Sequence, residues 1–266
     1  MTLLLQTAPT FARAESLEIK LAADRAELDA ALRLRFEVFN LELRAGLAAS
    51  YARGYDTDAY DAYCDHLIAR DTASGEVVGT YRLLRQRVAE RHIGFYSENE
   101  FDLTNLRRLP GELLELGRSC VARSHRSASV IARLWRAIIE YARERDIRWL
   151  FGCGSLPATD AAEVQRLYAY LRDHHSAPAE YRVAPHHRCR MQVSEVGAFD
   201  DARAALRQLS PVMKGYLRAG AVACGMPAYD AEFGTADVLM LMDLNRLAAR
   251  YRNHYEAPES WKERAA

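Results

Sequence analysis

A single carboxylate interrupts an apolar stretch in the middle of the chain. Glu115 lies within residues 112–121, which read as a strand, and Gly117 follows it by two positions. Burying a carboxylate is costly unless it is paired, and burial raises its pKa toward the range of a general base. Gly117 indicates a bulge or a close backbone approach by a ligand. An ion pair of Glu115 with Arg82 or Arg118 is the structural alternative, and the residues alone leave both interpretations open.

Charged residues of opposite sign gather in two other places. Acidic and aromatic residues fill positions 51–65, where Asp61 and Asp65 precede a strand and could hold a cationic substrate group, although such a loop is as often only solvated. Arginines gather at positions 118–136. Four of them, in a loop and on the following helix, could contact a phosphate or an acidic partner, namely Arg123, Arg126, Arg133 and Arg136. The alternative is the solvated face of a core helix.

The overall composition limits the classes of function. The 266 residues carry 36 basic and 36 acidic side chains, which excludes a general nucleic-acid binder. Only three of the basic residues are lysines, so arginine dominates, as genomic bias or anion recognition would produce. Five widely spaced cysteines without a C-x-x-C pair favour a reducing cytoplasm over a disulfide framework. We see no signal peptide and no transmembrane run, and predict a cytoplasmic protein.

The elements that must position these residues follow from periodicity. Residues 1–16 are predicted to be a flexible N-terminus, and 17–266 a single domain in which 155–266 form an integral C-terminal extension. Strands are expected at 17–21, 66–70, 76–84, 112–121, 147–151, 190–193 and 238–242. Helices are expected from Asp24 to about Gly46 and at 130–145, 161–173, 211–219 and 244–251. This order predicts an α/β (α+β) fold with a mixed sheet covered by helices.

Motifs of several common enzyme classes are missing from the sequence. There is no G-x-S-x-G, no P-loop and no dinucleotide fingerprint, which disfavours serine hydrolases, nucleotidases and dehydrogenases. The adjacent pairs His174-His175 and His186-His187 lack the spacing of a metal site, so no metal is predicted. The H-x-x-x-x-D pattern from His66 to Asp71, known from glycerolipid acyltransferases, spans a strand and its turn, and we interpret it as coincidence.

Several blocks in a fixed order together resemble the L-ornithine N-alpha-acyltransferase family of ornithine-lipid biosynthesis, across roughly residues 28–255. They are Leu34–Phe39, Tyr60–Leu67, Val78–Leu84, Glu115–Val121, Leu209–Pro211, Lys214–Arg218 and Phe233–Val238. The resemblance implies a Gcn5-related N-acyltransferase-like twisted sheet, related to that of acyl-homoserine-lactone synthases.

The resemblance also implies roles for individual residues. Glu115, Gly117 and Arg118 would lie at the reacting centre, with Glu115 as the base and the bulge as the oxyanion site. Arg35 and Phe36 would border the cleft. Asp61 or Asp65 would hold the side-chain ammonium of ornithine, while Arg82 or Arg118 would hold its carboxylate.

The implied reaction transfers a 3-hydroxyacyl chain from acyl carrier protein to the α-amine of L-ornithine, giving lyso-ornithine lipid. No bound cofactor is expected, because the donor is the acyl-phosphopantetheine of the carrier. The loop Arg123–Ala128 has Arg126 where acetyltransferases place the central glycine of their pyrophosphate loop, which favours a carrier protein over coenzyme A. An amphiphilic product leaves peripheral membrane contact open. The alternatives are an N-acyl amino acid or acyl-homoserine-lactone synthase and, more distantly, a non-catalytic, membrane-associated hemolysin-like module.

Overall fold

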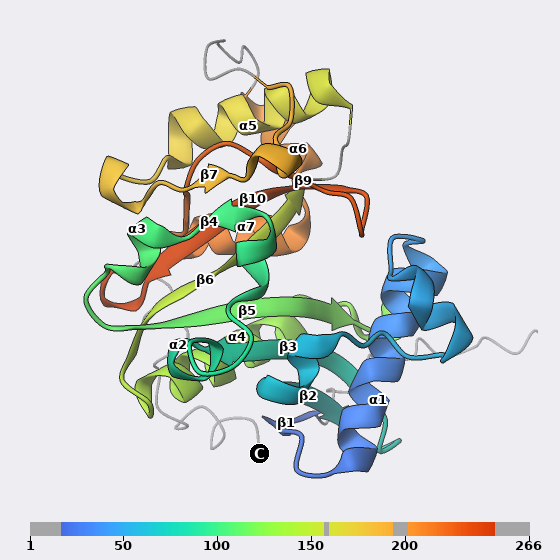
Figure 1. Cartoon of the computed structure of the whole chain (residues 1–266). Helices are drawn as coiled ribbons and strands as arrows, with labels where there is room; N and C mark the ends of the chain where they lie inside the picture. The colour runs from blue at the N-terminus through green and yellow to red at the C-terminus, as the bar shows by residue number, and fades with distance from the viewer. Residues whose placement is uncertain (1–16, 157–159, 194–201, 248–266) are drawn as a thin grey trace, which may run out of the picture.

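A mixed sheet forms the centre of the molecule in the computed structural model, which describes residues 17–156, 160–193 and 202–247. Within these residues the main sheet has the strand order β1-β2-β3-β5-β6-β10-β8, and β9 also pairs with β10. Figure 1 shows this sheet running through the molecule. All neighbours are antiparallel except β5 and β6. The predicted mixed sheet is therefore confirmed, whereas the predicted tail 1–16 lies outside the described residues.

Strand bounds agree closely with the periodicity in the first half of the chain. The strands of the main sheet are β1 (Leu17–Leu21), β2 (Asp65–Asp71), β3 (Val77–Arg85), β5 (Glu112–Val121), β6 (Ile147–Leu156), β8 (Val222–Ala223), β9 (Ala228–Asp230) and β10 (Thr235–Asp243). A separate pair joins β4 (Phe101–Asp102) to β7 (Ala184–Pro185). The strand predicted at 190–193 is wrong, because Arg190 makes only an isolated bridge to Ala228.

The parallel strands β5 and β6 separate halfway along their length. Their register runs from the pair Glu112 and Ile147 to the pair Glu115 and Phe151 and goes no further. Beyond that point β5 continues to pair with β3, and β6 pairs with β10. A Cβ on Gly152 would lie 2.3 Å from the carbonyl oxygen of Leu116, so only glycine permits the close approach where the strands part. The sheet thus opens into a fork directly after Glu115.

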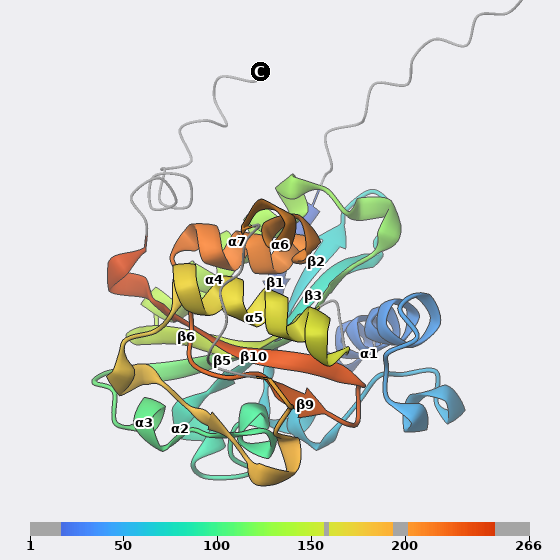
Figure 2. The same cartoon turned by 90° about the horizontal axis from the view of Figure 1, so that it is seen from above.

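Helices cover both faces of the sheet. On one face lie α4 (Ala128–Arg143), α5 (Ala161–His175), α6 (Ala202–Gln208) and α7 (Pro211–Ala219), which Figure 2 shows together on one side of the sheet. Their buried side chains contribute to the larger apolar core. On the other face lie the short helices α2 (Gln86–Ala89) and α3 (Thr104–Arg107), with a second core of aromatic and aliphatic side chains. The apolar stripe of α4 includes Leu134, Trp135 and Ile138, which are buried as predicted.

The first helix differs from its prediction in a way that affects the site. Asp24 caps α1 (Arg25–Arg35) by accepting a hydrogen bond from the amide of Glu27, as the capping pattern indicates. The chain then continues as a π-helix over Phe36–Glu42 rather than as an α-helix to Gly46. Each turn of a π-helix holds more residues, so the side chains that follow are rotated from the positions a regular helix gives them.

The last predicted helix is also shorter than expected. Residues Leu244–Arg246 form a single 3-10 turn, and the rest of the predicted helix, 248–251, lies outside the described residues. Among the residues that the structure describes, none of the helices combines the length and the apolarity that crossing a membrane requires.

Candidate active site

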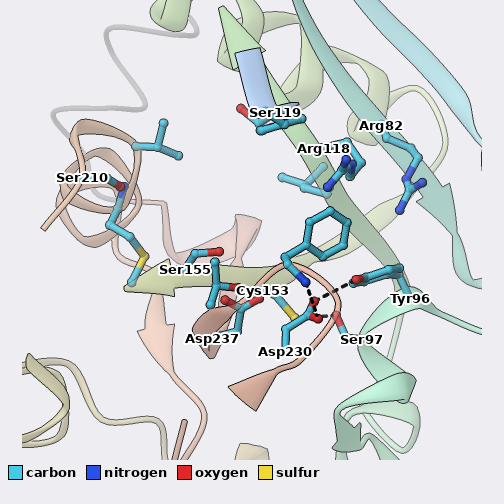
Figure 3. Close-up of a pocket in the computed structure, with 18 of the residues that line it drawn as sticks. Arg82, Tyr96, Ser97, Arg118, Ser119, Cys153, Ser155, Ser210, Asp230 and Asp237 are labelled. Carbon is cyan, nitrogen blue, oxygen red and sulfur yellow. Dashed lines mark hydrogen bonds between the residues drawn. The ribbon is translucent and has the colours of Figure 1, made fainter. Parts of the chain in front are cut away.

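A cavity of about 370 Å³ occupies the fork between β5 and β6. Figure 3 shows its polar lining, with Arg82 and Arg118 on one side and Asp230 and Asp237 on the other. Its wall comes from distant parts of the chain: the π-helix, β3, β5, β6, α7, β10 and the turn before β10. The lining includes Phe39, Leu43, Arg82, Tyr96, Ser97, Glu115, Gly117, Arg118, Ser119, Cys153, Ser155, Ser210, Met213, Tyr216, Asp230, Phe233 and Asp237.

Glu115 lies in this wall and is 5% exposed. It shares a face of β5 with Leu113, because side chains alternate along a strand, and this face meets residues 95–101. One carboxylate oxygen accepts from the amide of Tyr96 at 2.8 Å, and the other accepts from the amide and hydroxyl of Ser97 at 2.7 and 2.6 Å. Burial nevertheless raises the pKa of Glu115 above its ordinary value, as its position in the sequence predicts.

Three arginines and three aspartates form a buried ion-pair network beside the cavity. Arg35, which is 1% exposed, contacts Asp56 at 2.6 Å and Asp61 at 2.7 Å. The other members are Arg118, which pairs with Asp56, and Arg82, which pairs with Asp58 at 2.6 Å and Asp61 at 3.2 Å. The arginines lower the pKa of Asp61 to about 2. Because each charge has a partner of opposite sign within the protein, this network fixes the arginine side of the cavity.

The two aspartates expected to hold the acceptor are not placed for that role. Asp61 is enclosed by the network and does not line the cavity. Asp65 is exposed at the start of β2 and accepts a hydrogen bond from the hydroxyl of Tyr141 at 2.6 Å. The prediction of a direct acceptor contact is therefore corrected for both: Asp61 orients Arg35 and Arg82, and Asp65 anchors α4 to the sheet.

A bulge in β5 shapes the cavity wall, as Gly117 indicates. The register with β3 shifts between the pairs Thr80 with Cys120 and Arg82 with Gly117. The residue with the left-handed backbone is Arg118, at φ 49°, rather than the glycine. Its guanidinium lies 4.5 Å from the ring centre of Phe39 and 4.4 Å from that of Phe233. The bulge and two aromatic rings thus hold Arg118 at the cavity.

The π-helix exchanges the roles of two phenylalanines. Phe36 was expected to border the cleft, but it packs edge-on against Tyr51 at 5.7 Å and does not line the cavity. Phe39, three residues later, lines it together with Leu43. The change of helix type explains this correction, because a wider turn redirects the side chains after Arg35.

A second set of acidic side chains forms what we call the acidic floor: Glu100, Asp230 and Asp237, which are 3%, 7% and 4% exposed. Asp230 accepts from the hydroxyl of Tyr96 at 3.0 Å and from two backbone amides of its own turn. Burial and the neighbouring carboxylates raise the pKa of Glu100 to about 9 and that of Asp237 to about 6. In contrast to the ion-pair network, no arginine or lysine forms an ion pair with these groups among the described residues.

Cys153 lies against the acidic floor. Its sulfur is 3.4 Å from the hydroxyl of Ser97 and 3.7 Å from a carboxylate oxygen of Glu100. Burial and these carboxylates raise the pKa of the Cys153 thiol well above its ordinary value, so it is a poor nucleophile. Within the described ranges, Glu100, Cys153 and Asp237 are the one group whose ligand atoms lie close enough together to hold a metal ion.

The four arginines predicted to contact the donor lie around the start of α4. Arg123 and Arg126 are exposed in the loop before the helix, Arg133 is exposed on the helix and Arg136 is half-buried. Arg126 pairs with Glu42 at 2.7 Å, so the π-helix neutralises part of this charge. Ser127 caps α4 by accepting from the amide of Val130.

Sequence reasoning missed the residues that surround Glu115 on the other strands and loops. Tyr96, Ser97 and Glu100 lie in residues 86–111, where no periodic pattern draws attention to them. Asp230 lies three residues before the block Phe233–Val238, and Asp237 lies within that block. A polar position inside the apolar strand Thr235–Asp243 was the available signal for Asp237. That signal is the same one that identified Glu115.

Comparisons with known proteins place this geometry in a family. Residues 34–136 match the acetyltransferase (GNAT) domain. The L-ornithine N(alpha)-acyltransferase of Rhizobium meliloti (strain 1021) is 38% identical over 255 residues, which cover 92% of this chain and 86% of the relative. The enzyme of the same name from Rhodobacter capsulatus is 38% identical over 246 residues, covering 90% of this chain and 95% of the relative. The chain belongs to the L-ornithine N(alpha)-acyltransferase family.

As a member of this acyltransferase family, the chain is an N-acyltransferase. Solved structures agree on the fold. The acyl-homoserine-lactone synthase LasI matches with a TM-score of 0.53 at 16% identity, over 90% of this chain and 94% of that chain. The CoA-dependent acyl-homoserine-lactone synthase BjaI matches with a TM-score of 0.52 at 15% identity, over 92% and 90%. The ornithine acyltransferase family thus shares its fold with these synthases.

Proposed function

We propose that this protein transfers a 3-hydroxyacyl chain from the phosphopantetheine of acyl carrier protein to the α-amine of L-ornithine, forming lyso-ornithine lipid. The observation that carries the proposal is the cavity at the β5–β6 fork, in which the buried carboxylate of Glu115 faces a charged lining. The curated relatives are named for ornithine acylation, and this chain covers almost their whole length.

The reaction needs a neutral amine and a place for negative charge. The neutral amine nitrogen of the acceptor attacks the thioester carbonyl carbon, the C–S bond breaks, and the carrier leaves as a thiolate, which takes up the proton that the nitrogen loses after Glu115 has passed it on. Glu115 accepts the proton that the amine gives up, directly or through the hydroxyl of Ser97, which donates to it at 2.6 Å. The raised pKa of Glu115 favours this transfer, because a stronger base holds the proton better.

The bulge in β5 is the proposed oxyanion site. Gly117, Arg118 and Ser119 all line the cavity beyond the last paired residues of β5 and β6. Backbone N–H groups in such a bulge can donate to the oxygen on which charge develops during acyl transfer. The guanidinium of Arg118 or Arg82 would bind the carboxylate of the acceptor, and both are held by the aspartates of the ion-pair network.

The donor is proposed to approach along the fork from the side of α4. Tyr216, Met213 and Leu116 supply apolar lining for an acyl chain, and the cavity lies between the strands where the sheet is open. Arg123, Arg126, Arg133 and Arg136 would meet the acidic surface of the carrier protein. Arg126 would exchange its contact with Glu42 for one with the carrier.

The proposal is tested with purified protein, 3-hydroxyacyl carrier protein or the corresponding acyl-CoA, and a panel of amino acids. Mass spectrometry of the products should show N-acyl-ornithine with the carrier protein as the better donor. Product only with other amino acids would overturn ornithine as the acceptor. Faster reaction with acyl-CoA would overturn the carrier protein as the donor. The absence of product with every amino acid tested would overturn the proposal that the protein acylates amino acids.

A further inference from the structure

We propose that the acidic floor, Glu100, Asp230 and Asp237, binds the side-chain ammonium group of the acceptor and so selects a diamino acid. The inference rests on the proposed function, since it names the subsite that would distinguish ornithine from amino acids with apolar side chains. It replaces Asp61 and Asp65, whose surroundings do not suit that role.

Two oxygens of the acidic floor have no donor in the protein. Oδ1 of Asp237 and Oε2 of Glu100 are buried and accept no hydrogen bond. A buried acceptor without a donor is costly, and a second carboxylate nearby adds repulsion. An ammonium group corrects both, because it brings three N–H donors and one positive charge. The unpartnered oxygen of Asp237 belongs to a residue that lines the cavity, so a ligand there can reach it.

The spacing to Glu115 suits an amino acid with an amine at the end of its side chain. Tyr96 connects the two places: its backbone amide donates to Glu115 at 2.8 Å, and its hydroxyl donates to Asp230 at 3.0 Å. One residue thus contacts both the base and the acidic floor, so the two places border the same cavity and an acceptor with two amino groups can meet both. One nitrogen would lie at Glu115 while the other lies at Asp230 and Asp237.

The opposite wall completes the recognition of a zwitterion. Arg82 and Arg118 face the cavity across from the aspartates (Figure 3). An acceptor whose carboxylate lies toward the arginines and whose side-chain ammonium lies toward Asp237 presents its α-amine near Glu115. Burial raises the pKa of Asp237, and an ammonium bound beside it would favour the charged carboxylate and lower that pKa.

A divalent metal ion is the competing occupant of this floor. It would be bound by Glu100, Asp237 and the thiolate of Cys153. We favour the ammonium because the proposed acceptor carries one, and because its binding needs no proton loss from the Cys153 thiol, whereas binding of a metal would release that proton. The two carboxylate oxygens without donors can each accept a hydrogen bond from an ammonium group while Cys153 stays a thiol.

The test compares ornithine with 2-aminopentanoate, which has the same carbon chain without the second amine. Binding of each to the full-length protein is measured by calorimetry without an acyl donor, and acylation of each is measured with one. Asp237→Asn and Glu100→Gln should each weaken ornithine binding by about thirtyfold or more, as loss of a buried charge contact does, and leave 2-aminopentanoate unchanged. Asp243→Asn, on the same strand but paired with Arg148 outside the cavity, is the matched control.

The inference would be overturned if both folded variants kept the wild-type ratio of ornithine affinity to 2-aminopentanoate affinity. It would also be overturned if EDTA abolished the preference of the wild type for ornithine, because a metal ion would then be the occupant. Circular dichroism identifies a variant that does not fold, and the wild-type preference for ornithine then still decides, because equal binding of the two amino acids overturns the subsite. Selective ornithine binding without acyl transfer supports the subsite and rejects the proposed reaction. Acyl transfer without a preference for ornithine supports the proposed reaction and rejects the subsite.

Discussion

Two acidic clusters lie close to the same cavity, and their carboxylates have opposite surroundings. In the ion-pair network, Asp56 and Asp61 each contact arginines at hydrogen-bond distance, and the pKa of Asp61 falls to about 2. In the acidic floor, one oxygen of Glu100 and one of Asp237 have no donor, and the pKa values of both groups rise. A buried charge with partners indicates a structural role, whereas a buried charge without one indicates a ligand.

The largest effect is expected at Glu115, which lies between the two clusters. Glu115→Gln keeps the shape of the side chain and an oxygen that can accept from Tyr96 or Ser97, but it removes the proton acceptor. We expect turnover to fall by about two to four powers of ten, the usual contribution of a general base. Steady-state rates with acyl carrier protein and ornithine measure this.

Glu112→Gln is the matched control for that substitution. Glu112 is the first residue of the same strand, pairs with Arg85 at 2.6 Å and does not line the cavity. Its variant should retain turnover close to that of the wild type. A rate for Glu115→Gln similar to that of Glu112→Gln would remove Glu115 from the role of base.

Breaking the ion-pair network should lower the stability of the folded protein as its primary effect. Arg35→Met leaves Asp56 and Asp61 without their shared partner in a buried place. Asp56 keeps Arg118 and Asp61 keeps Arg82, but the network then holds one more negative charge than positive charges. The free energy of unfolding should fall by about 3–5 kcal/mol, the usual cost of removing one partner from a buried ion pair. Arg33→Met, two residues earlier on the exposed face, is the control and should change stability by no more than about 1 kcal/mol. Urea denaturation of both variants separates these outcomes, and equal losses would contradict a structural network.

The contribution of the acidic floor to protein stability should change with pH in the opposite direction from that of the ion-pair network. The lowered pKa of Asp61 contributes stability that is present above its unfolded value of 3.8 and is lost as the pH falls toward about 2. The raised pKa of Asp237 means that the folded state binds the proton more tightly, so stability declines as the pH rises from about 4 through about 6. The groups that face Asp237 are Glu100, Asp230, Cys153 and the hydroxyls of Ser155 and Thr235.

Asp237→Asn tests this contrast without a ligand. An amide cannot ionise, so the variant should become more stable relative to the wild type as the pH rises from 4 to 7, while its ornithine binding weakens. Denaturation at both pH values, with Asp243→Asn beside it, measures the difference. A stability difference that does not change with pH would show that the buried charge of Asp237 has no cost in the folded protein.

The smallest effect is expected at the outer surface. Arg133→Glu combined with Arg136→Glu should raise the KM for the carrier protein on the order of tenfold at low salt, with a smaller effect at high salt because ions screen surface charges. Arg143 is the last residue of the same helix, and Arg143→Glu should change the KM for the carrier protein less than the double substitution does. A KM that is the same in the double variant and the wild type would contradict carrier docking at the start of α4.

Sequence periodicity predicted the framework better than the site. The strand at 112–121 and the helix at 211–219 agree with β5 and α7 residue for residue, because alternation, capping and flanking turns are local properties. Glu115 was also found locally, as a charge inside an apolar strand. The residues around it were not, because Tyr96, which donates to Glu115, meets Asp230 across 134 positions of sequence and only the folded sheet brings them together.

The same limit explains the wrong role given to Asp61. An acidic loop before a strand carries the signature of a binding loop, and nothing in residues 56–65 shows that Arg35, Arg82 and Arg118 would occupy its carboxylates. The π-helix after Arg35 was equally hidden, since the spacing of Phe36 and Phe39 fits an ordinary helix. Both errors concern which partner a side chain meets, which is a property of the tertiary structure.

Strand β10 has a consequence for how the protein is made. It lies close to the end of the chain, yet it pairs with β6 over eight residues and brings Asp237 to the cavity. During synthesis, therefore, β6 leaves the ribosome with one edge uncovered, and the site then has Glu115 and Glu100 but neither Asp230 nor Asp237. A nascent chain that stops before Thr235 would lack Asp237, so the proposed selectivity would be complete only after β10 has been made.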